Sequence, residues 1–365
     1  MQKRYGWCKM NDFNLPALSI KPLTRISPSR FYASQLCHLR EILVASGQPA
    51  LLPVPPAARI GSVVHTIIEM ATGGKIHNET QFNETWQKEI SKIEESMNSN
   101  PLECHLVPLE ETAADYEVKK FMVLQTISSF VSDGRRYDPQ KGRGRPEVWL
   151  ETKDGKIGGK IDLIKETPEG TVIIDYKTGS IIDAQHDEPK EEYQQQLKLY
   201  AGLFFENFNK WPQKLLLVGI DQSVHEVIFS QAECIRLLEQ AKKYISDTNE
   251  LISSGISAND FAAPSPEACR YCLFRPGCYK YWQARQDTED WPIDVIGHIR
   301  EKGFAGNNLG RLVIEADEKR YTVRALSLRH ILLNGTYKNA LICNLGNDTS
   351  PGYYIERLLT TSYGF

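Results

Sequence analysis

The sequence has 365 residues, of which 41% are hydrophobic and 24% charged, and its formal net charge is −3. This length allows two or three domains, and the composition is that of a globular protein rather than a disordered or membrane-spanning one. No apolar run approaches the ~20 residues that cross a bilayer, and the first residues lack the apolar core of a signal peptide, so we expect a cytoplasmic protein with no membrane partner. The net charge gives no global sign of nucleic-acid binding, but a local basic groove would suffice.

Residues 1–135 are predicted to form a mainly helical region. Apolar residues recur at helical spacing along it, and serine, proline and glycine stand at the expected starts and stops. Four segments have this pattern: 27–48, 59–74, 83–97 and 113–132.

Residues 136–284 are predicted to form an α/β core. Three strand-like runs come first, with Asp154-Gly155 as a hairpin turn between the first two. A helix, two more strands and a long helix follow. The segments are, in order, 147–153, 155–166, 171–178, 191–208, 215–220, 223–230 and 231–255. This order predicts a mixed central β-sheet flanked by helices, with the third strand at its centre.

The end of the chain is expected to be a separate, small all-β domain. Residues 285–295 resemble a linker, and residues 296–365 contain short strand-like runs separated by glycine and asparagine. The runs indicate a small barrel or sandwich. Scattered basic residues favour an oligonucleotide-binding barrel; they are Lys319, Arg320, Arg324 and Arg329.

The segment 158–180 carries the residues with the clearest chemistry. Strand alternation places Asp175 and Lys177 on one face, and the neighbouring strand can bring Asp162 beside them. Two converging carboxylates repel each other unless a hard divalent cation such as Mg²⁺ or Mn²⁺ binds between them. A lysine beside that cation can orient or deprotonate a water and stabilise an anionic transition state. This combination suits hydrolysis of a phosphodiester.

The alternative for this segment is a solvated hairpin with scattered charges. Against it, the run Val172-Ile173-Ile174 before Asp175 is apolar enough for a central strand. A charged pair on a central strand needs a compensating partner.

These residues resemble the motifs of the PD-(D/E)XK nuclease superfamily, in its RecB-like branch. The branch has Gly-x-x-Asp, matched by Gly159 to Asp162, and then Asp-x-Lys, matched by Asp175 to Lys177. A restriction-endonuclease-like core is the fold that the resemblance implies.

Two helical motifs of the branch are also matched. The Gln-x-x-x-Tyr motif fits Gln196 and Tyr200, and the Gly-x-x-x-His motif fits Gly61 and His65. Each match alone also fits an ordinary amphipathic helix or a packed histidine.

The resemblance implies a role for each matched residue. Lys177 would be the catalytic lysine, and Gln196 and Tyr200 would hydrogen-bond a phosphate or base. A glutamate on the preceding strand, Glu147 or Glu151, would join the site, unless both are strand-edge charges. The implied metal ligands are His65, Asp162, Asp175 and the main-chain carbonyl of Tyr176.

The segment CRYCLFRPGC brings three of the eight cysteines close together in sequence: Cys269, Cys272 and Cys278. Three thiolates do not complete a tetrahedral set, and Cys37 is the best candidate for the fourth ligand. Four cysteines can hold a [4Fe–4S] cluster or zinc. The other cysteines are interpreted as isolated apolar or surface residues.

One cysteine before the nuclease core and three after it resemble the iron–sulfur nucleases of the RecB-like branch. These include AddB-type nuclease domains and CRISPR-associated RecB-type exonucleases. The resemblance favours a [4Fe–4S] cluster that clasps the ends of the domain, with zinc as the alternative.

A basic glycine-rich loop precedes the first core strand and is predicted to hold phosphates without reading sequence. The alternative is an ordinary solvated loop. Its basic residues are Arg135, Arg136, Lys141, Arg143 and Arg145.

The sequence therefore predicts a Mg²⁺- or Mn²⁺-dependent deoxyribonuclease that acts on single-stranded DNA or free DNA ends in repair, recombination or antiviral defence. An exonuclease is favoured over an endonuclease. No Walker-type phosphate loop is present, so a helicase would have to be a partner protein. The alternatives are a non-catalytic nucleic-acid-binding module and an RNA-directed or defence nuclease that a partner protein activates.

Overall fold

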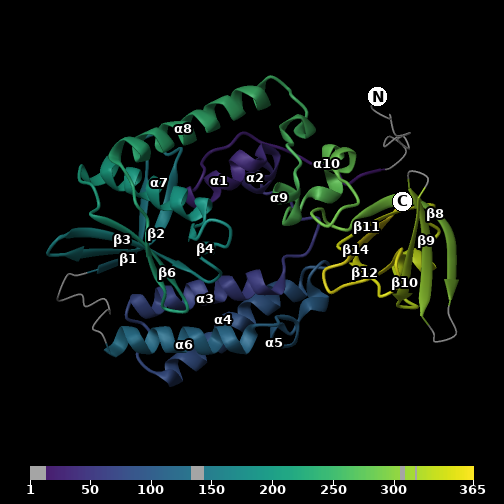
Figure 1. The fold of residues 1–365 in the computed structure, drawn as a ribbon, viewed down its shortest axis with the longest axis horizontal. Helices are drawn as coiled ribbons and strands as arrows, with labels where there is room; N and C mark the ends of the chain where they lie inside the picture. The colour runs from purple at the N-terminus through teal and green to yellow at the C-terminus, as the bar shows by residue number, and fades with distance from the viewer. Residues whose placement is uncertain (1–13, 133–143, 305–308, 317–318) are drawn as a thin grey trace. The chain divides into compact units, whose positions relative to one another are not determined.

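The computed structural model describes residues 14–132, 144–304, 309–316 and 319–365 (Figure 1). The chain forms two compact units. The larger unit comprises Ile20–Gly47 and Pro55–Ser257, and the smaller unit comprises Met1–Ser19, Gln48–Val54 and Ala258–Phe365. No helix in the described ranges is long and apolar enough to cross a membrane.

A mixed five-stranded sheet forms the centre of the larger unit, as predicted. Its order is β1-β2-β3-β6-β7, so β3 is the central strand. The β1–β2, β2–β3 and β6–β7 pairs are antiparallel and the β3–β6 pair is parallel. Gly155 turns the chain between β1 and β2 with a φ of +68°, which suits glycine. The strands are β1 (Gly144–Glu151), β2 (Gly158–Thr167), β3 (Gly170–Lys177), β6 (Lys214–Gly219) and β7 (Val224–Glu226), and a separate ribbon pairs β4 (Ile182–Asp183) with β5 (Glu188–Pro189).

Helices cover this sheet in two groups. α7 packs against the sheet and α8 packs against α7, whereas α3, α4 and α6 form the group on the other side in Figure 1. The helices are α1 (Pro28–Leu36), α2 (His38–Ala45), α3 (Pro56–Thr72), α4 (Glu79–Asn98), η2 (Cys104–Leu106), α5 (Leu109–Thr112), α6 (Tyr116–Ser132), α7 (Glu191–Phe208) and α8 (Gln231–Ser253). The α/β fold class predicted from the sequence is confirmed.

Local signals explain where the long helices begin and end. The Asn78 side chain accepts a hydrogen bond from the Gln81 main-chain N–H at the start of α4, and Ser230 caps α8 in the same way. α7 has the predicted bounds, and it ends where Asn209 adopts a left-handed φ of 51°.

The single helix predicted over 27–48 is wrong, because the chain forms two helices that meet at Cys37. Cys37 is extended, with φ −155° and ψ 108°, and it is both the C-cap residue of α1 and the N-cap residue of α2. The turn lets α2 pack against α1, where Arg30 Nε lies 2.7 Å from Glu41 Oε2. Glycine and proline, the usual sequence marks of such a break, are absent at this position.

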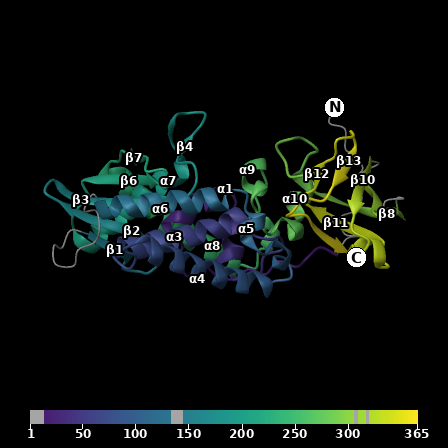
Figure 2. The same ribbon diagram turned by 90° about the horizontal axis from the view of Figure 1, so that it is seen from below.

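The smaller unit contains a seven-stranded sheet in the order β12-β13-β10-β9-β8-β11-β14 (Figure 2). An oligonucleotide-binding barrel has five strands, and a binding role for this sheet stays a prediction. The strands are β8 (Val295–Phe304), β9 (Gly310–Ala316), β10 (Lys319–Leu326), β11 (Asn339–Cys343), β12 (Gly346–Asn347), β13 (Tyr353–Ile355) and β14 (Thr361–Gly364). Its helical segments are η3 (Ala258–Phe261), α9 (Pro266–Arg270), η4 (Arg275–Gly277), α10 (Tyr279–Ala284) and α11 (Ile331–Asn334).

A buried ion pair joins the cysteine-rich segment to this sheet. Arg275 and Asp294 are 2% and 0% exposed, and Arg275 Nε lies 2.6 Å from Asp294 Oδ2. The guanidinium also donates to the main-chain oxygen of Cys272 at 3.1 Å and to the Asn344 side chain. Residues 285–295 therefore do not form the linker that their composition indicates, since Asp294 is an anchored core residue directly before β8.

Replacing Arg275 by Ala is expected to destabilise the protein by about 3–5 kcal/mol, because Asp294 would remain buried without its cation. Denaturant unfolding followed by circular dichroism measures the change. The control is Arg300→Ala, which breaks an exposed, solvent-screened pair with Glu315 in the same unit and should change the stability far less. Equal effects of the two substitutions would contradict the importance of the buried pair.

Candidate active site

Three acidic residues form a row across β1, β2 and β3: Glu147, Asp162 and Asp175. The neighbours of Glu147 pair with the neighbours of Asp162 in the β1–β2 ladder. The β2–β3 ladder ends at Leu163 and Ile174, which directly adjoin Asp162 and Asp175. Asp162 and Asp175 are 5% and 3% exposed, so two carboxyl groups are buried near each other in the middle of the sheet.

Glu147 joins this row through an unusual backbone conformation. It has a φ of 56° within a strand, which is the left-handed region that non-glycine residues rarely adopt. Its carboxylate lies 2.8 Å from Lys160 Nζ. Glu151, the other glutamate considered from the sequence, instead lies 2.8 Å from Arg25 Nη2. The structure thus brings Glu147, and not Glu151, into contact with this cluster.

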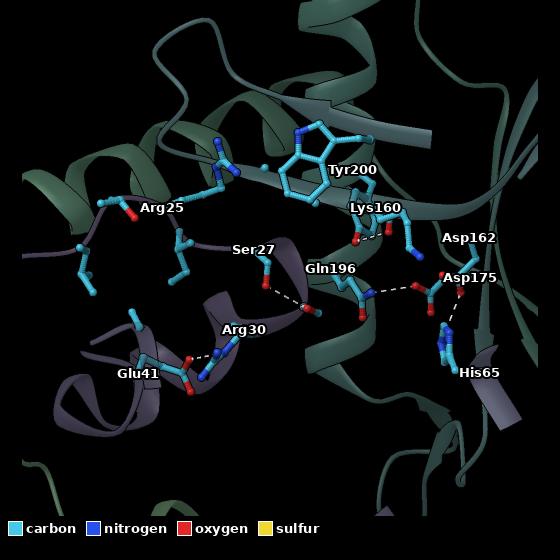
Figure 3. Close-up of a pocket in the computed structure, with 18 of the residues that line it drawn as sticks. Arg25, Ser27, Arg30, Glu41, His65, Lys160, Asp162, Asp175, Gln196 and Tyr200 are labelled. Atoms are coloured by element: carbon cyan, nitrogen blue, oxygen red, sulfur yellow. Dashed lines mark hydrogen bonds and ion pairs between the residues drawn. The ribbon is translucent and has the colours of Figure 1, made fainter. Parts of the chain in front are cut away.

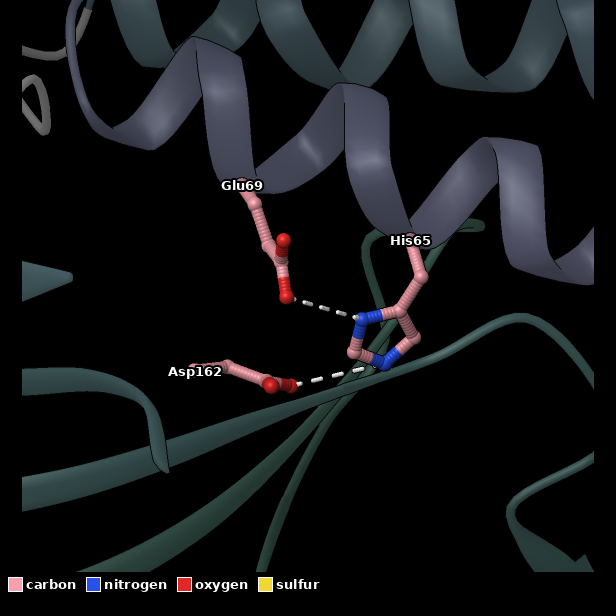
Figure 4. A group of neighbouring side chains, drawn as sticks. All are labelled: His65, Glu69 and Asp162. Carbon is pink, nitrogen blue, oxygen red and sulfur yellow. Dashed lines mark ion pairs between the residues drawn. The ribbon is translucent and has the colours of Figure 1, made fainter. Parts of the chain in front are cut away.

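Helix α3 brings His65 and Glu69 to the same cluster (Figure 4). His65 Nε2 lies 3.6 Å from Asp162 Oδ2, and His65 Nδ1 lies 3.7 Å from Glu69 Oε1. One ligand atom from each of His65, Glu69 and Asp162 lies within 4.8 Å of the others. Sequence reasoning missed Glu69. The available signal was its position one turn after His65, where both side chains share a helix face.

Asp175 has different partners (Figure 3). The Gln196 side-chain amide, from α7, donates to Asp175 Oδ1 at 2.7 Å and accepts from Lys177 Nζ at 2.7 Å. Lys177 Nζ also lies 2.8 Å from Asp175 Oδ2 and 4.3 Å from the centre of the Tyr193 ring. Within the described residues, the buried Asp175 Oδ2 accepts no hydrogen bond of good geometry.

Tyr200 forms a hydrogen bond with the backbone of β2. Its hydroxyl donates to the main-chain oxygen of Lys160 at 2.8 Å, two residues before Asp162. Burial raises the pKa of Tyr200, which keeps the phenol neutral and able to donate. Gln196 and Tyr200 therefore hydrogen-bond other residues of the site, a geometry that fits positioning better than the contact with a phosphate or base expected from sequence.

The electrostatics of the two carboxyl groups facing His65 differ. Burial and the nearby Asp175 raise the pKa of Asp162 to about 7, against the opposing effects of His65 and the Tyr176 N–H. Burial also acts to raise the pKa of Glu69, but hydrogen bonds with His65, Glu147 and Lys160 outweigh it and lower the pKa to about 2. Glu69 is therefore the permanent anion of the pair, whereas Asp162 needs further positive charge to ionise fully near neutral pH.

These residues fit a divalent cation. The cluster offers an imidazole nitrogen and carboxylate oxygens, a donor set that suits Mn²⁺ or Mg²⁺. The raised pKa of the buried Asp162 is a feature that a bound cation would compensate. Asp175 itself lies outside the 4.8 Å group and pairs with Lys177 instead.

The remaining residues predicted from the sequence lie elsewhere. Cys37 is in the larger unit, and the three clustered cysteines are in the smaller unit; all four are buried. Arg145 places its guanidinium 5.3 Å from the centre of the Phe208 ring. The other basic residues of the loop lie outside the described residues: Arg135, Arg136, Lys141 and Arg143.

Replacing Asp162 by Asn is expected to change the pH dependence of stability in protein stripped of divalent cations. A carboxyl group whose pKa rises from 3.8 to about 7 on folding stabilises the fold below pH 3.8. That contribution is lost as the pH rises towards 7, by up to about 4 kcal/mol. The Tm of the parent should therefore fall more steeply than that of D162N across this range, and D162N should be the more stable protein above pH 7.

Thermal unfolding in the presence of a chelator measures both curves. Asp247→Asn is the control, because Asp247 is an exposed residue of α8 in a surface pair with Lys243. Parallel curves for the parent and D162N would contradict the raised pKa.

Comparison with known protein families matches residues 24–279 to the PD-(D/E)XK nuclease superfamily. The match covers more than half of the chain and includes the whole acidic row, α3 and α7. A comparison with curated proteins finds no match. The specific resemblance to the RecB-like branch stays a prediction, and at the level of the superfamily the expectation from the sequence is confirmed: the chain belongs to the PD-(D/E)XK nuclease superfamily.

Proposed function

We propose that this protein is a metal-dependent deoxyribonuclease whose active site is the acidic row with His65 and Lys177. The observation that carries the proposal is the convergence of buried carboxylates, an imidazole and a lysine on the central strands of a PD-(D/E)XK fold. Buried like charges are costly unless a cation joins them, and phosphodiester hydrolysis is the chemistry that such a cation and a neighbouring lysine serve.

Mg²⁺ or Mn²⁺ would be held by His65, Asp162 and Asp175, with the main-chain carbonyl of Tyr176 as a further ligand. We add Glu69 to this set, because its carboxylate lies within reach of the His65 and Asp162 ligand atoms. When bound, the ion would supply a polarised water and neutralise charge on the scissile phosphate.

Lys177 is the residue proposed to act on the water and the phosphate. Its side chain is 13% exposed, so the ammonium group works in a largely desolvated place where its charge is poorly screened. Gln196 holds Lys177 and Asp175 at a fixed separation through its two hydrogen bonds. Lys177 is thereby positioned to orient the attacking water by a hydrogen bond and, as an ammonium, to stabilise the negative charge that develops on the phosphoryl oxygens.

Single-stranded DNA or free DNA ends are the proposed substrate, with exonuclease action favoured, in repair, recombination or defence. The basic loop before β1 would hold phosphates; of the basic residues predicted for it, Arg145 alone lies in the described ranges, and it stands at the start of β1 itself. The competing proposals are a non-catalytic binding module and a nuclease that needs a helicase or defence-system partner. The complete set of polar residues at the site supports catalysis over binding alone.

K177A and E69Q should impair the reaction in different ways. K177A removes the group that orients the water and stabilises charge on the phosphate but no proposed metal ligand, so we expect cleavage to fall at least 100-fold, roughly the contribution of one electrostatic contact to a transition state. Mn²⁺ affinity should stay unchanged in K177A. E69Q should weaken Mn²⁺ binding, measured by isothermal titration calorimetry, and excess metal should restore part of its activity. Cleavage is measured on end-labelled single- and double-stranded DNA with Mg²⁺, Mn²⁺ or EDTA.

The matched control for K177A is Lys214→Ala. Lys214 lies on the neighbouring strand β6 in an exposed pair with Glu226, so its loss should leave cleavage unchanged. Metal-dependent cleavage by K177A at the parental rate would refute the proposed site. Absence of cleavage by a folded, metal-binding parent would favour the binding module or the partner-activated nuclease.

We also propose a [4Fe–4S] cluster ligated by Cys37, Cys269, Cys272 and Cys278. The cysteine spacing and the family resemblance support the cluster, and the low exposure of all four residues agrees with it. Hydrogen bonds from Arg275 to the main-chain oxygens of Cys269 and Cys272 give this segment a defined backbone. Zinc is the alternative for the same ligands.

C37A is expected to lose iron and inorganic sulfide and to unfold at a lower temperature than the parent. Metal and sulfide analysis of protein purified without oxygen provides the measurement, and Cys104→Ala, at an exposed cysteine, is the control. Zinc in place of iron would establish the alternative. Unchanged metal content and Tm in C37A would remove Cys37 from the ligand set.

A further inference from the structure

A cavity of about 590 Å³ extends from the candidate active site across the larger unit. His65, Asp162 and Asp175 line one part of it, whereas Arg25 and Trp149 line another. In Figure 3, Arg25, Ser27 and Arg30 lie on the opposite side of the view from Asp162 and Asp175. A volume of this size is in the range of small-ligand sites, roughly 300–1,000 Å³, and the proposed catalytic residues occupy only part of the cavity wall.

Trp149 is the most unusual residue of this wall. It lies on β1, two residues after Glu147, and half of its surface is exposed. An exposed tryptophan loses the free energy that its apolar ring would gain by burial. An isolated exposed residue of this kind needs no explanation, but this one lines the same cavity as the acidic row.

Neighbouring groups hold the indole in place. The Arg25 guanidinium carbon lies 5.0 Å from the centre of the Trp149 ring, and Trp149 Nε1 donates to Glu151 Oε2 at 3.1 Å. Arg25 is fixed in turn by Glu151 and by a 3.0 Å hydrogen bond to the main-chain oxygen of Gly155. The ring is therefore ordered before any ligand binds, which lowers the entropy cost of binding.

Gly158 on β2 makes this arrangement possible. A Cβ atom at this position would lie 3.2 Å from Trp149 Cζ2, 3.3 Å from Arg25 Cδ and 2.9 Å from Glu151 Cβ. The three side chains thus pack directly over the β2 backbone at a point that precedes Asp162 on the same strand. Because one strand carries both the indole support and the proposed metal ligand, the sheet sets their separation.

We propose that Trp149, positioned by Arg25, is a base-stacking residue that selects an unpaired nucleotide next to the scissile phosphate. A flat, exposed ring accepts any nucleobase on its face, but a base inside a duplex is already stacked between its neighbours. The proposal rests on the nuclease function proposed above and names its substrate class: single-stranded DNA, or duplex DNA whose end has frayed.

The test is a binding measurement that does not depend on cleavage. Fluorescein-labelled single strands of one sequence, each with one abasic nucleotide at a different position, are titrated with protein in Ca²⁺ to avoid cleavage. For the parent, we expect one position at which loss of the base weakens binding roughly 5- to 150-fold, the range for one stacked base. W149A should bind the intact strand weakly, by a similar factor, and should be insensitive to the abasic site at that position.

Two further variants make the test specific. W149F keeps an aromatic face and should recover part of the affinity and of the abasic sensitivity. Phe121→Ala removes an exposed aromatic residue from α6, outside the cavity, and should bind like the parent. Circular dichroism and Tm show whether each variant is folded.

Different experimental results would refute the stacking proposal and the nuclease proposal. If W149A retains parental affinity and the same abasic profile, the stacking role is wrong, whatever the outcome of the cleavage assay with K177A. If W149A loses the abasic sensitivity while the parent cuts no DNA under any metal condition, the stacking residue is supported and the catalytic role of the site is wrong.

Discussion

Repulsion among the carboxylates of three adjacent strands is the constraint on which the larger unit depends. Each member of the row has its own compensation. Lys160 bridges Glu147 and Glu69, while Lys177 and Gln196 hold Asp175. Asp162 faces His65 and accepts a hydrogen bond from the Tyr176 N–H, yet its pKa remains high, at about 7. The deficit of positive charge is therefore concentrated at Asp162, where a cation would be stabilised most.

The groups that compensate this charge come from regular elements rather than loops. His65 and Glu69 lie on α3, Gln196 and Tyr200 on α7, and Lys160 and Lys177 on the strands themselves. Such elements hold side chains within a small range of positions, which proton transfer and metal binding both require. The smaller unit also compensates a buried charge, because Arg275 and Asp294 form a buried hydrogen-bonded pair between the cysteine segment and the sheet.

Two kinds of feature could be predicted from the sequence: helices and strands with a strong hydrophobic periodicity, and candidate site residues that belong to a motif. The bounds of α7 and the central place of β3 followed from pattern alone. The break at Cys37 did not, because the residue has no conformational bias and tertiary packing decides its backbone. The linker interpretation of residues 285–295 failed for a related reason, since only the pairing of Asp294 with Arg275 makes the end of this segment part of the core.

Prediction from the sequence meets the same limit at the candidate site, where contacts between distant residues decide which side chains take part. Glu69 belongs to no motif considered, and an acid one turn after a histidine is common on exposed helices. Glu147 and Glu151 share a strand face by alternation, so sequence alone left both open. The backbone at Glu147 distinguishes them, since its left-handed φ of 56° accompanies the contact with Lys160, while Glu151 pairs with Arg25.

The left-handed backbone of Glu147 lowers the stability of the fold at the position that supplies one carboxylate of the acidic row. A non-glycine residue in the left-handed region costs on the order of 1–3 kcal/mol, a cost that glycine would avoid. Glycine would also remove the carboxylate from the acidic row and with it one partner of Lys160. Stability alone would therefore favour glycine at position 147, and under the proposed function the carboxylate would be retained there at the expense of stability.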